Sequence, residues 1–273
     1  MISIIITTKN EEKNIDRLLK SIFIQYNRDK HEIIVIDNFS TDRTCQIISY
    51  YKEIKLFSHG PERSAQRNFG IQKSKENIIL ILDADMEISP NLLDNIEKDF
   101  KTLNCDGLYI EEKILCNGIF GNVRKLERKF YIATNIDCAR VFKKQTLLKV
   151  GCYDENLTGP EDWDLDNKIL NNKGQIKLLN NPKAYINHYE VGMDIINYLK
   201  KKKNYSLGYS YFKKKWRGSE YLKKQLGVCY RLFFVFIENK KYKIALKQPL
   251  IFVLMYLVVV LKAVVVLKNY LKK

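Results

Sequence analysis

The chain has 273 residues, of which 46% are hydrophobic and 12% aromatic, with 12 glycines and 5 prolines. This composition excludes disordered, collagen-like and low-complexity proteins and provides enough apolar material for a core. Residues 197–273 contain 19 Lys and Arg against 2 Asp and Glu, a net charge of +17, whereas residues 1–196 have a net charge of −1. We therefore expect a neutral body over residues 1–196 and a basic region over residues 197–273 that meets an anionic partner.

Strands and helices are predicted to alternate along the first hundred residues. Because these strands are apolar along their whole length, the pattern predicts an α/β fold with a mostly parallel sheet that helices cover on both faces. Ser89 is expected to cap the helix that follows it, with Pro90 in the first turn. The predicted strands are 2–6, 32–36, 54–57 and 77–82, and the predicted helices are 11–21, 42–51, 61–74 and a helix beginning at 90.

Polar residues follow three of the predicted strands, where Thr7, Asp37 and Asp83 stand. In open α/β sheets, ligands bind beyond the carboxyl ends of the strands. Taken singly, Asp37 has an alternative reading as a turn residue, and Asp42 reads as a helix N-cap. The coincidence of polar residues at three strand ends favours a binding site at this edge.

Asp83 and Asp85 flank a single alanine directly after an apolar strand. Their side chains point to opposite sides of an extended segment, so that one carboxylate can hold Mg²⁺ or Mn²⁺ and the other a sugar hydroxyl or a water. Arg63 and Arg67, on the preceding helix, suit a diphosphate, with an ordinary surface position as the alternative. His188 either completes the metal site or is a buried, hydrogen-bonded histidine.

Glu161 and Asp162 lie at the predicted start of another helix, where the helix dipole alone favours carboxylates. The functional interpretation is that an aspartate here acts as general base on an acceptor hydroxyl, while Trp163 stacks on a sugar face. Asp164 and Asp166 are expected to face solvent. The six cysteines form no C-x-x-C pair, which favours buried thiols over disulfides or a zinc site.

An apolar run, residues 250–261, resumes after Lys262 and continues to residue 267, before Lys268, Lys272 and Lys273. Three interpretations remain open: a membrane-spanning helix, a helix lying in the membrane interface, and a packing helix. Upstream, clusters of lysine alternate with tyrosine and tryptophan, as in segments that meet anionic lipid. We expect an anionic membrane surface rather than nucleic acid as the partner, with a merely solvated basic helix as the alternative.

Five segments in this order resemble the family 2 glycosyltransferases, over about residues 1–190: IIITTKNEEKNI, IVIDNFSTDRT, RSAQRNFGI, ILILDADMEIS and VGCYDENLTGPEDWDL. The resemblance implies a GT-A fold and an inverting enzyme that uses Mg²⁺ or Mn²⁺ and a nucleotide-activated sugar. Cys152 departs from the second glycine found in many relatives, which affects a turn. The segment beginning HYEVG is similar to the region after the catalytic domain in relatives that act on lipid-linked acceptors.

The resemblance also implies roles for single residues. It places Thr7, Glu11 and Asp37 along the nucleoside, and Arg67 and Asp83 in support of the nucleotide-sugar. It implies Asp85 as a metal ligand and Asp162, with Glu161 beside it, as the general base.

The expected activity is transfer of a sugar from a nucleotide-diphosphate sugar to a hydroxyl of a polyprenyl-linked glycan. The expected location is the cytoplasmic face of the cell membrane, peripheral or monotopic, with a single span left open. The alternative is a polyprenyl-phosphate glycosyltransferase, whose phosphate acceptor needs no deprotonation, so that Asp162 would matter less. A sugar nucleotidylyltransferase is disfavoured because no glycine follows the first strand to cradle a triphosphate.

Overall fold

The computed structural model describes residues 1–25 and 28–271, so Lys272 and Lys273 lie outside the described residues. Contacts within the chain define two compact units, each assembled from several segments. The sequence predicts a single boundary at residue 196, whereas the contacts divide the chain at several points. The boundary at 196 stays a prediction. Unit 1 comprises Met1–Glu112, Ala139–Glu155 and Asp164–His188, and unit 2 comprises Lys113–Cys138, Asn156–Trp163 and Tyr189–Lys273.

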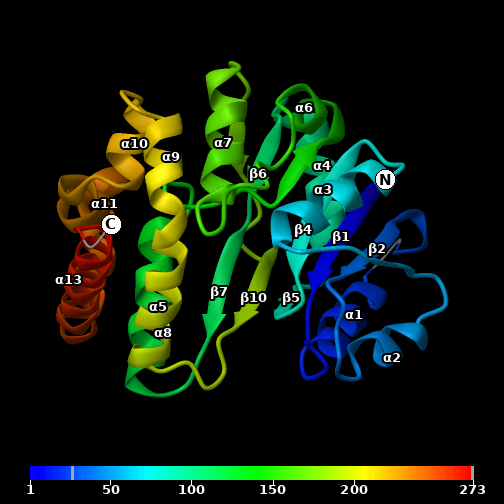
Figure 1. Ribbon diagram of the computed structural model, residues 1–273, viewed down its shortest axis with the longest axis horizontal. Helices are drawn as coiled ribbons and strands as arrows, with labels where there is room; N and C mark the ends of the chain where they lie inside the picture. The colour runs from blue at the N-terminus through cyan, green and yellow to red at the C-terminus, as the bar shows by residue number, and fades with distance from the viewer. Residues whose placement is uncertain (26–27, 272–273) are drawn as a thin grey trace. The chain divides into compact units, whose positions relative to one another are not determined.

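Unit 1 contains a seven-stranded sheet in the order β3-β2-β1-β4-β8-β6-β9. The strands β3, β2, β1 and β4 run parallel, β8 runs antiparallel to its neighbours β4 and β6, and β9 is parallel to β6. The four predicted strands are thus confirmed as one parallel half (Figure 1). The bounds are β1 Ile2–Thr8, β2 Glu32–Asp37, β3 Lys55–Ser58, β4 Ile78–Asp83, β6 Gly107–Tyr109, β8 Val141–Lys143 and β9 Ile176–Leu178.

Alternate residues of the central strands are buried on opposite faces of this sheet. Ile4 and Ile6 of β1 join one apolar cluster, while Ile5 joins a second cluster. Helices α1 and α4 contribute to the first cluster, and α3, α6 and α7 contribute to the second, so both faces are covered as predicted. The helices are α1 Ile15–Phe23, α2 Thr44–Ser49, α3 Arg63–Lys73, α4 Leu92–Thr102, α6 Lys144–Lys149 and α7 Glu161–Asn171, with a short 3₁₀ turn η1 at Arg28–Lys30.

A second, three-stranded sheet has the order β5-β10-β7, formed by Met86–Ile88, Tyr185–Tyr189 and Glu111–Leu115. The pairing of its first strand shows that the prediction of Ser89 as a helix cap is wrong. The Ser89 hydroxyl accepts a hydrogen bond from the Tyr185 amide at 2.8 Å, and the Ser89 amide donates to the Tyr185 carbonyl. Because Ser89 extends the pairing of β5 with β10, helix α4 begins only at Leu92.

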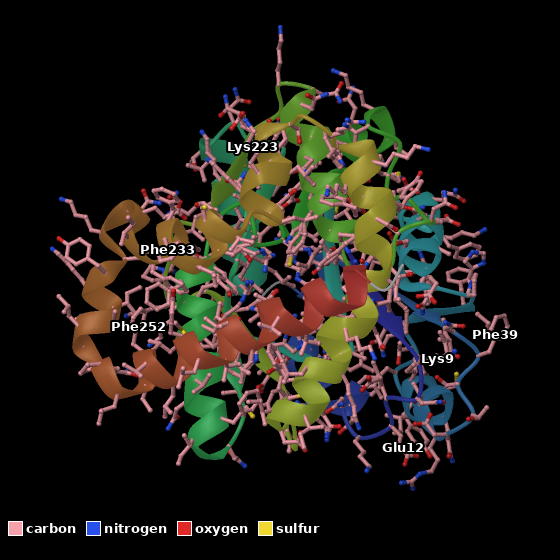
Figure 2. The ribbon with its side chains drawn as sticks, turned by 60° about the vertical axis from the view of Figure 1, so that its left-hand side comes forward. Lys9, Glu12, Phe39, Lys223, Phe233 and Phe252 are labelled. Atoms are coloured by element: carbon pink, nitrogen blue, oxygen red, sulfur yellow. The ribbon has the colours of Figure 1, made fainter. Side chains whose placement is uncertain are left out.

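Unit 2 is helical, as expected for residues 197–273, and it also includes α5 from the middle of the chain. Its core joins Val123, Leu126 and Phe130 of α5 to apolar residues of the C-terminal helices, among them Met255 of α13. Helix α13 packs against α5 and α8 (Figures 1 and 2). The elements are α5 Gly118–Tyr131, α8 Ile195–Tyr205, η2 Ser206–Gly208, α9 Tyr209–Lys215, α10 Glu220–Gln225, η3 Tyr230–Phe234, α11 Val235–Ile237, η4 Glu238–Lys240, α12 Tyr242–Lys247 and α13 Pro249–Leu271.

Two sequence-based expectations concern single features of this fold. All six cysteines are free thiols, but only Cys105 and Cys116 are buried as predicted, whereas Cys45, Cys138 and Cys152 are half-buried and Cys229 is exposed. Within the described residues, the segment Pro249–Val266 is long and apolar enough to cross a membrane by length and composition, and 22% of it is buried against the protein.

Candidate active site

The parallel strands bring three of the predicted site residues to one edge of the sheet. The register pairs Thr8 of β1 with Asp37 of β2, and Thr7 of β1 with Asp83 of β4. The Thr7 hydroxyl donates a hydrogen bond to Asp83 Oδ1 at 3.2 Å. The carboxyl ends of neighbouring parallel strands therefore converge here, as the sequence predicts.

Asp37 is buried and holds the loop that follows β2. Its Oδ2 accepts from the Ser40 amide at 2.7 Å and its Oδ1 from the Ser40 hydroxyl at 2.5 Å. Asn10, in the loop after β1, accepts from the Thr41 amide at 2.8 Å and so joins the two loops. Asp42 accepts from the Thr44 amide at 3.0 Å, but the N-cap residue of α2 is Arg43, so Asp42 lies one residue before the cap and the predicted cap position is wrong.

Glu11 lies among the acidic residues of this edge. Its amide donates to the Thr44 hydroxyl, and its carboxylate accepts from Asn14 Nδ2 at 2.7 Å. Burial raises the pKa of Glu11, the hydrogen bond from Asn14 opposes this, and the negative charges of Asp85 and Asp83 raise it further. An anionic ligand needs additional positive charge to occupy such a site.

Asp83 lies between two arginines of unit 1. Arg67 Nη2 donates to Asp83 Oδ1 at 3.0 Å, and Arg140 Nη1 donates to Asp83 Oδ2 at 3.2 Å. Burial opposes ionisation of this carboxyl, but the charges of Arg67 and Arg140 outweigh it and hold the pKa of Asp83 well below its usual range. Asp83 is therefore a fixed anion whose two oxygens already have partners.

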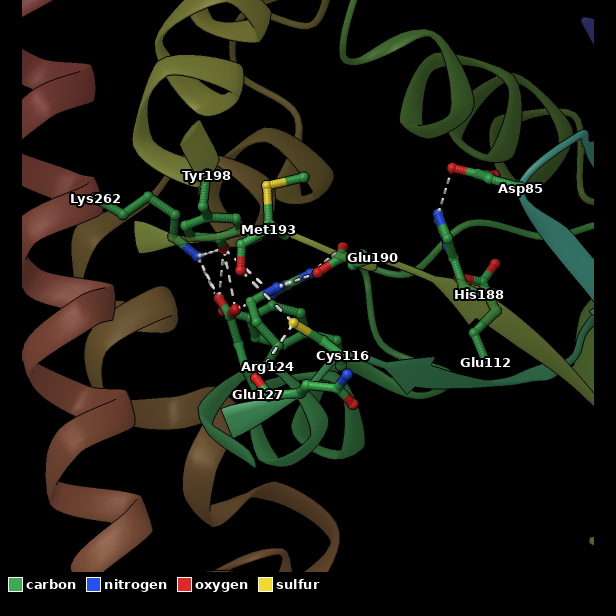
Figure 3. A network of polar contacts seen from close by, with 12 residues as sticks. Asp85, Glu112, Cys116, Arg124, Glu127, His188, Glu190, Met193, Tyr198 and Lys262 are labelled. Atoms are coloured by element: carbon green, nitrogen blue, oxygen red, sulfur yellow. Dashed lines mark hydrogen bonds and ion pairs between the residues drawn. The ribbon is translucent and has the colours of Figure 1, made fainter. Parts of the chain in front are cut away.

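The second aspartate of the motif ends a chain of charged side chains (Figure 3). His188 Nε2 lies 3.2 Å from Asp85 Oδ2, and His188 Nδ1 lies 3.5 Å from Glu112 Oε2. Glu112 Oε1 accepts from Arg140 Nε at 2.8 Å, so the chain returns to Asp83. Burial lowers the pKa of His188, but Asp85 and Glu112 outweigh this effect and raise it to about 9.

Asp85 keeps one oxygen that fits a divalent cation. Its Oδ1 is buried and accepts no hydrogen bond, and carboxylate oxygens are preferred ligands of Mg²⁺ and Mn²⁺. Among residues 1–25 and 28–271, no group of three or more His, Cys, Asp or Glu side chains could hold a metal ion. The donor set therefore fits a cation that takes most of its ligands from a diphosphate or water.

The predicted catalytic pair begins helix α7 and belongs to unit 2. Glu161 is buried, and its Oε2 accepts from the Gly159 amide at 2.5 Å, so this carboxylate anchors the preceding turn. Asp162 is half-buried. Trp163 packs against Tyr209 and lies under the Arg231 guanidinium, 4.9 Å from the ring centroid. The catalytic and acceptor roles of Glu161, Asp162 and Trp163 stay predictions.

Asp164 and Asp166, expected to face solvent, are buried. They belong to the part of α7 that lies in unit 1, where Leu165 and Ile169 join the second apolar cluster of the large sheet. Asp166 Oδ2 accepts from the Ala139 amide at 3.2 Å. Asp164 lies 3.5 Å from Lys168, which satisfies its charge inside the protein.

Sequence comparison identifies a family model and several relatives that each match part of the chain. Residues 3–115 match the model of Glycosyl transferase family 2. Poly(ribitol-phosphate) beta-N-acetylglucosaminyltransferase TarS of Staphylococcus aureus is 29% identical over 120 residues, which cover 41% of this chain and 21% of TarS. Glycosyltransferase AglE of Haloferax volcanii is 34% identical over 91 residues, which cover 31% and 30% of the two chains. The matches thus span less than a third of the length of these relatives.

Two solved structures extend the likeness to nearly the whole chain at the level of fold. S. aureus TarS 1–349 in complex with UDP-GlcNAc has a TM-score of 0.57 at 20% identity, covering 94% of this chain and 79% of that one. Mannosyltransferase PcManGT from Pyrobaculum calidifontis, in complex with GDP-Man and Mn²⁺, has a TM-score of 0.64 at 17% identity, covering 96% and 86%. Residues 3–115 therefore resemble Glycosyl transferase family 2, and the chain shares the GT-A-like fold of these two glycosyltransferase structures.

Proposed function

We propose that this chain transfers a sugar from a nucleotide-diphosphate sugar to an acceptor hydroxyl with inversion of configuration. The observation that carries the proposal is the carboxyl edge of the sheet. There Thr7, Asp37 and Asp83 meet in register, and Asp85 Oδ1 is buried without a hydrogen-bond partner. Complexes of similar folds hold UDP-GlcNAc in one case and GDP-Man with Mn²⁺ in another, which supports a nucleotide-sugar as donor.

In this proposal, unit 1 holds the donor. Thr7, Glu11 and Asp37 line the nucleoside, while Arg67 and Arg140 keep Asp83 ionised and fixed beside the nucleotide-sugar. Asp85, with His188, would hold a Mg²⁺ or Mn²⁺ ion, which when bound supplies positive charge against the diphosphate.

The chemical step is a single displacement in which Asp162 is the general base. Asp162 takes the proton of the acceptor hydroxyl, and the oxygen forms a bond to the anomeric carbon. The bond from that carbon to the diphosphate oxygen breaks, and the nucleoside diphosphate leaves with the bonding electrons. Attack from the face opposite the leaving group inverts the anomeric configuration. Glu161 supports this step by holding the turn before α7 through the Gly159 amide.

We further propose a polyprenyl-linked acceptor, presented at the cytoplasmic face of the cell membrane. The net charge of +17 over residues 197–273 and the apolar segment Pro249–Val266 support a membrane location. In the alternative, the acceptor is the polyprenyl phosphate itself, whose oxygen is already ionised. The two acceptors are distinguished by whether transfer needs a base.

The donor site is tested by thermal stability in the presence of UDP- and GDP-sugars, with Mn²⁺ or with EDTA. We expect the true donor to raise the unfolding temperature only with Mn²⁺, because a ligand stabilises the state that binds it. Asp85→Asn should lose this shift, whereas Asp94→Asn, which changes a carboxylate in the first turn of α4, should keep it. An equal shift for Asp85→Asn and the unmodified chain would contradict the assignment.

A further inference from the structure

Helix α13 of unit 2 has two different faces. Met255, Val258, Val259 and Lys262 are buried against the unit. The opposite side carries apolar residues at intervals of three, four and seven, the spacing of one helix face. These side chains are between 41% and 79% exposed, and we call them the α13 stripe: Leu250, Val253, Leu254, Leu257, Leu261 and Val264.

The lysine inside this apolar helix is paired with the protein. Lys262 Nζ lies 2.5 Å from Glu127 Oε1 of α5 and 3.5 Å from the Tyr198 hydroxyl of α8 (Figure 3). Glu127 also pairs with Arg124, and Arg124 binds Glu190 through two nitrogens at 2.9 Å each. The charge of Lys262 is therefore satisfied on the protein side of the helix, which fixes how the helix is rotated.

This pairing opposes a membrane-spanning position for α13. A spanning helix outside the protein would place Lys262 in hydrocarbon and would leave Glu127, which is buried in unit 2, without one of its two cations. A helix lying along the surface keeps the pair and turns only the stripe outward.

The composition of residues 197–273 indicates what covers the stripe. The preceding segment of unit 2 also exposes apolar residues, among them Phe233, Ile237 and Leu246 (Figure 2 labels Phe233). Residues 197–273 carry only 2 acidic side chains, so a second copy would bring the same strong positive charge to the interface. An anionic lipid surface is complementary to both the apolar and the basic character.

We propose that α13 lies in the plane of an anionic bilayer, with the stripe in one leaflet and Lys262 turned inward to Glu127. The proposal rests on the proposed function for its purpose, which is to bring the enzyme to a lipid-linked acceptor. The tests measure binding to lipid vesicles and the depth of α13 in the bilayer, and they do not measure sugar transfer. Failure of this proposal is therefore distinguishable from failure of the transferase assignment.

The first experiment is flotation of the 273-residue chain with vesicles of phosphatidylglycerol and phosphatidylcholine. We expect the double variant Leu254→Glu, Leu257→Glu to bind at least tenfold more weakly, whereas Leu148→Glu, an exposed leucine on α6, binds normally. Both stripe positions are exposed, so the variant should fold, which thermal unfolding checks. Unchanged vesicle binding by the stripe variant overturns the proposal. So does a stripe-dependent dimer that ignores lipid.

The second experiment measures depth with a nitroxide label at Leu250→Cys, Leu257→Cys or Val264→Cys. Each variant is made in a background in which the accessible cysteines Cys45, Cys138, Cys152 and Cys229 are replaced by serine. A helix in the membrane plane puts the three labels at similar shallow depths. A spanning helix puts the label at 257 near the bilayer centre and the other two near opposite surfaces, and that result overturns the proposal.

Discussion

Glu112 joins the two halves of the charged chain in unit 1, and this position makes a prediction at the scale of one residue. It accepts from Arg140 Nε and faces His188 Nδ1, and a carboxylate in this place fixes the orientation of the imidazole. We expect Glu112→Gln to lower kcat/KM for the donor by about 10- to 100-fold, the usual effect of losing such a partner of a ligating histidine. The measurement is donor turnover as a function of Mn²⁺ concentration.

The control lies on the same strand. Glu111 is one residue earlier in β7, on the less buried side of the alternating pattern. Glu111→Gln should leave both turnover and its Mn²⁺ dependence unchanged. If the two variants behave alike, Glu112 has no positioning role.

We expect the two acidic residues at the start of α7 to have different roles, Asp162 as the general base and Glu161 as the residue that holds the preceding turn. Asp162→Asn should lower turnover by about 10²–10⁴, the range for loss of a general base, while donor affinity stays near normal. Glu161→Gln should have a much smaller effect, because its amide oxygen still accepts from the Gly159 amide. Single-turnover kinetics measures the rate of transfer, and calorimetry measures donor affinity, so the two effects are separated. Wild-type transfer by Asp162→Asn would place the base elsewhere or make the acceptor a phosphate.

The sequence predicts the part of the site that follows strand ends, and it misses the part that long-range packing assembles. Thr7, Asp37 and Asp83 meet because three long apolar strands pair in parallel, which a sequence pattern reveals. Glu112 and Arg140 pair across 28 residues of sequence, and no local spacing marks that contact. The sequence of β7, EEKIL, has no alternation of charged and apolar residues that would single out Glu112.

At the scale of elements, α3 approaches β1 unusually closely at a glycine. A Cβ on Gly70 would lie 2.5 Å from Ile5 Cγ2, a methyl of a stiff β-branched side chain in the sheet core. Helix propensity favours alanine over glycine by about 1 kcal/mol, but overpacking costs about 1–3 kcal/mol. We expect Gly70→Ala to destabilise the protein by roughly 1–2 kcal/mol in urea unfolding.

The matched control for this contact is Gln72→Ala, two residues later on the exposed side of α3. It changes helix propensity without touching Ile5, so we expect a small effect within about 0.5 kcal/mol. A Gly70→Ala variant as stable as the control would mean that α3 can shift away from β1 at little cost.

Among the elements, length decides what the sequence can predict. The parallel strands β1, β2 and β4 have six or seven residues, and most of these residues are apolar. The strands β6, β8 and β9 have three residues each, too few for a periodic pattern, and their pairing depends on the sheet already present. The three-stranded sheet is not predicted because its strands have only three to five residues and pair with segments far away in the sequence. The pairing partner of Ser89, for example, lies 96 residues away, so the sequence around Ser89 predicts a helix cap.

At the scale of the whole molecule, the C-terminal helices complete an apolar core that begins in the middle of the chain. The α5 residues Val123, Leu126 and Phe130 are buried together with Tyr198 and with apolar residues of α11 and α13. Glu127 of the same helix depends on Lys262 for one of its cations. Residues 197–273 are thus part of the core around α5. These contacts indicate that removing residues 197–273 would expose apolar residues of α5.

A chain that ends at residue 196 can test this packing. The boundary predicted from the sequence and the contacts within unit 2 lead to opposite expectations for that fragment. A domain boundary there predicts a soluble fragment with normal donor binding. The contacts of unit 2 predict a fragment that exposes the apolar face of α5, binds a hydrophobic dye and aggregates. We expect the second outcome, together with partial recovery of solubility when Leu126→Lys and Phe130→Ser remove the exposed apolar surface. The measurements are soluble yield, dye fluorescence and the unfolding temperature with and without donor and Mn²⁺. A monomeric fragment 1–196 with the stability of the full chain would instead establish the boundary at 196.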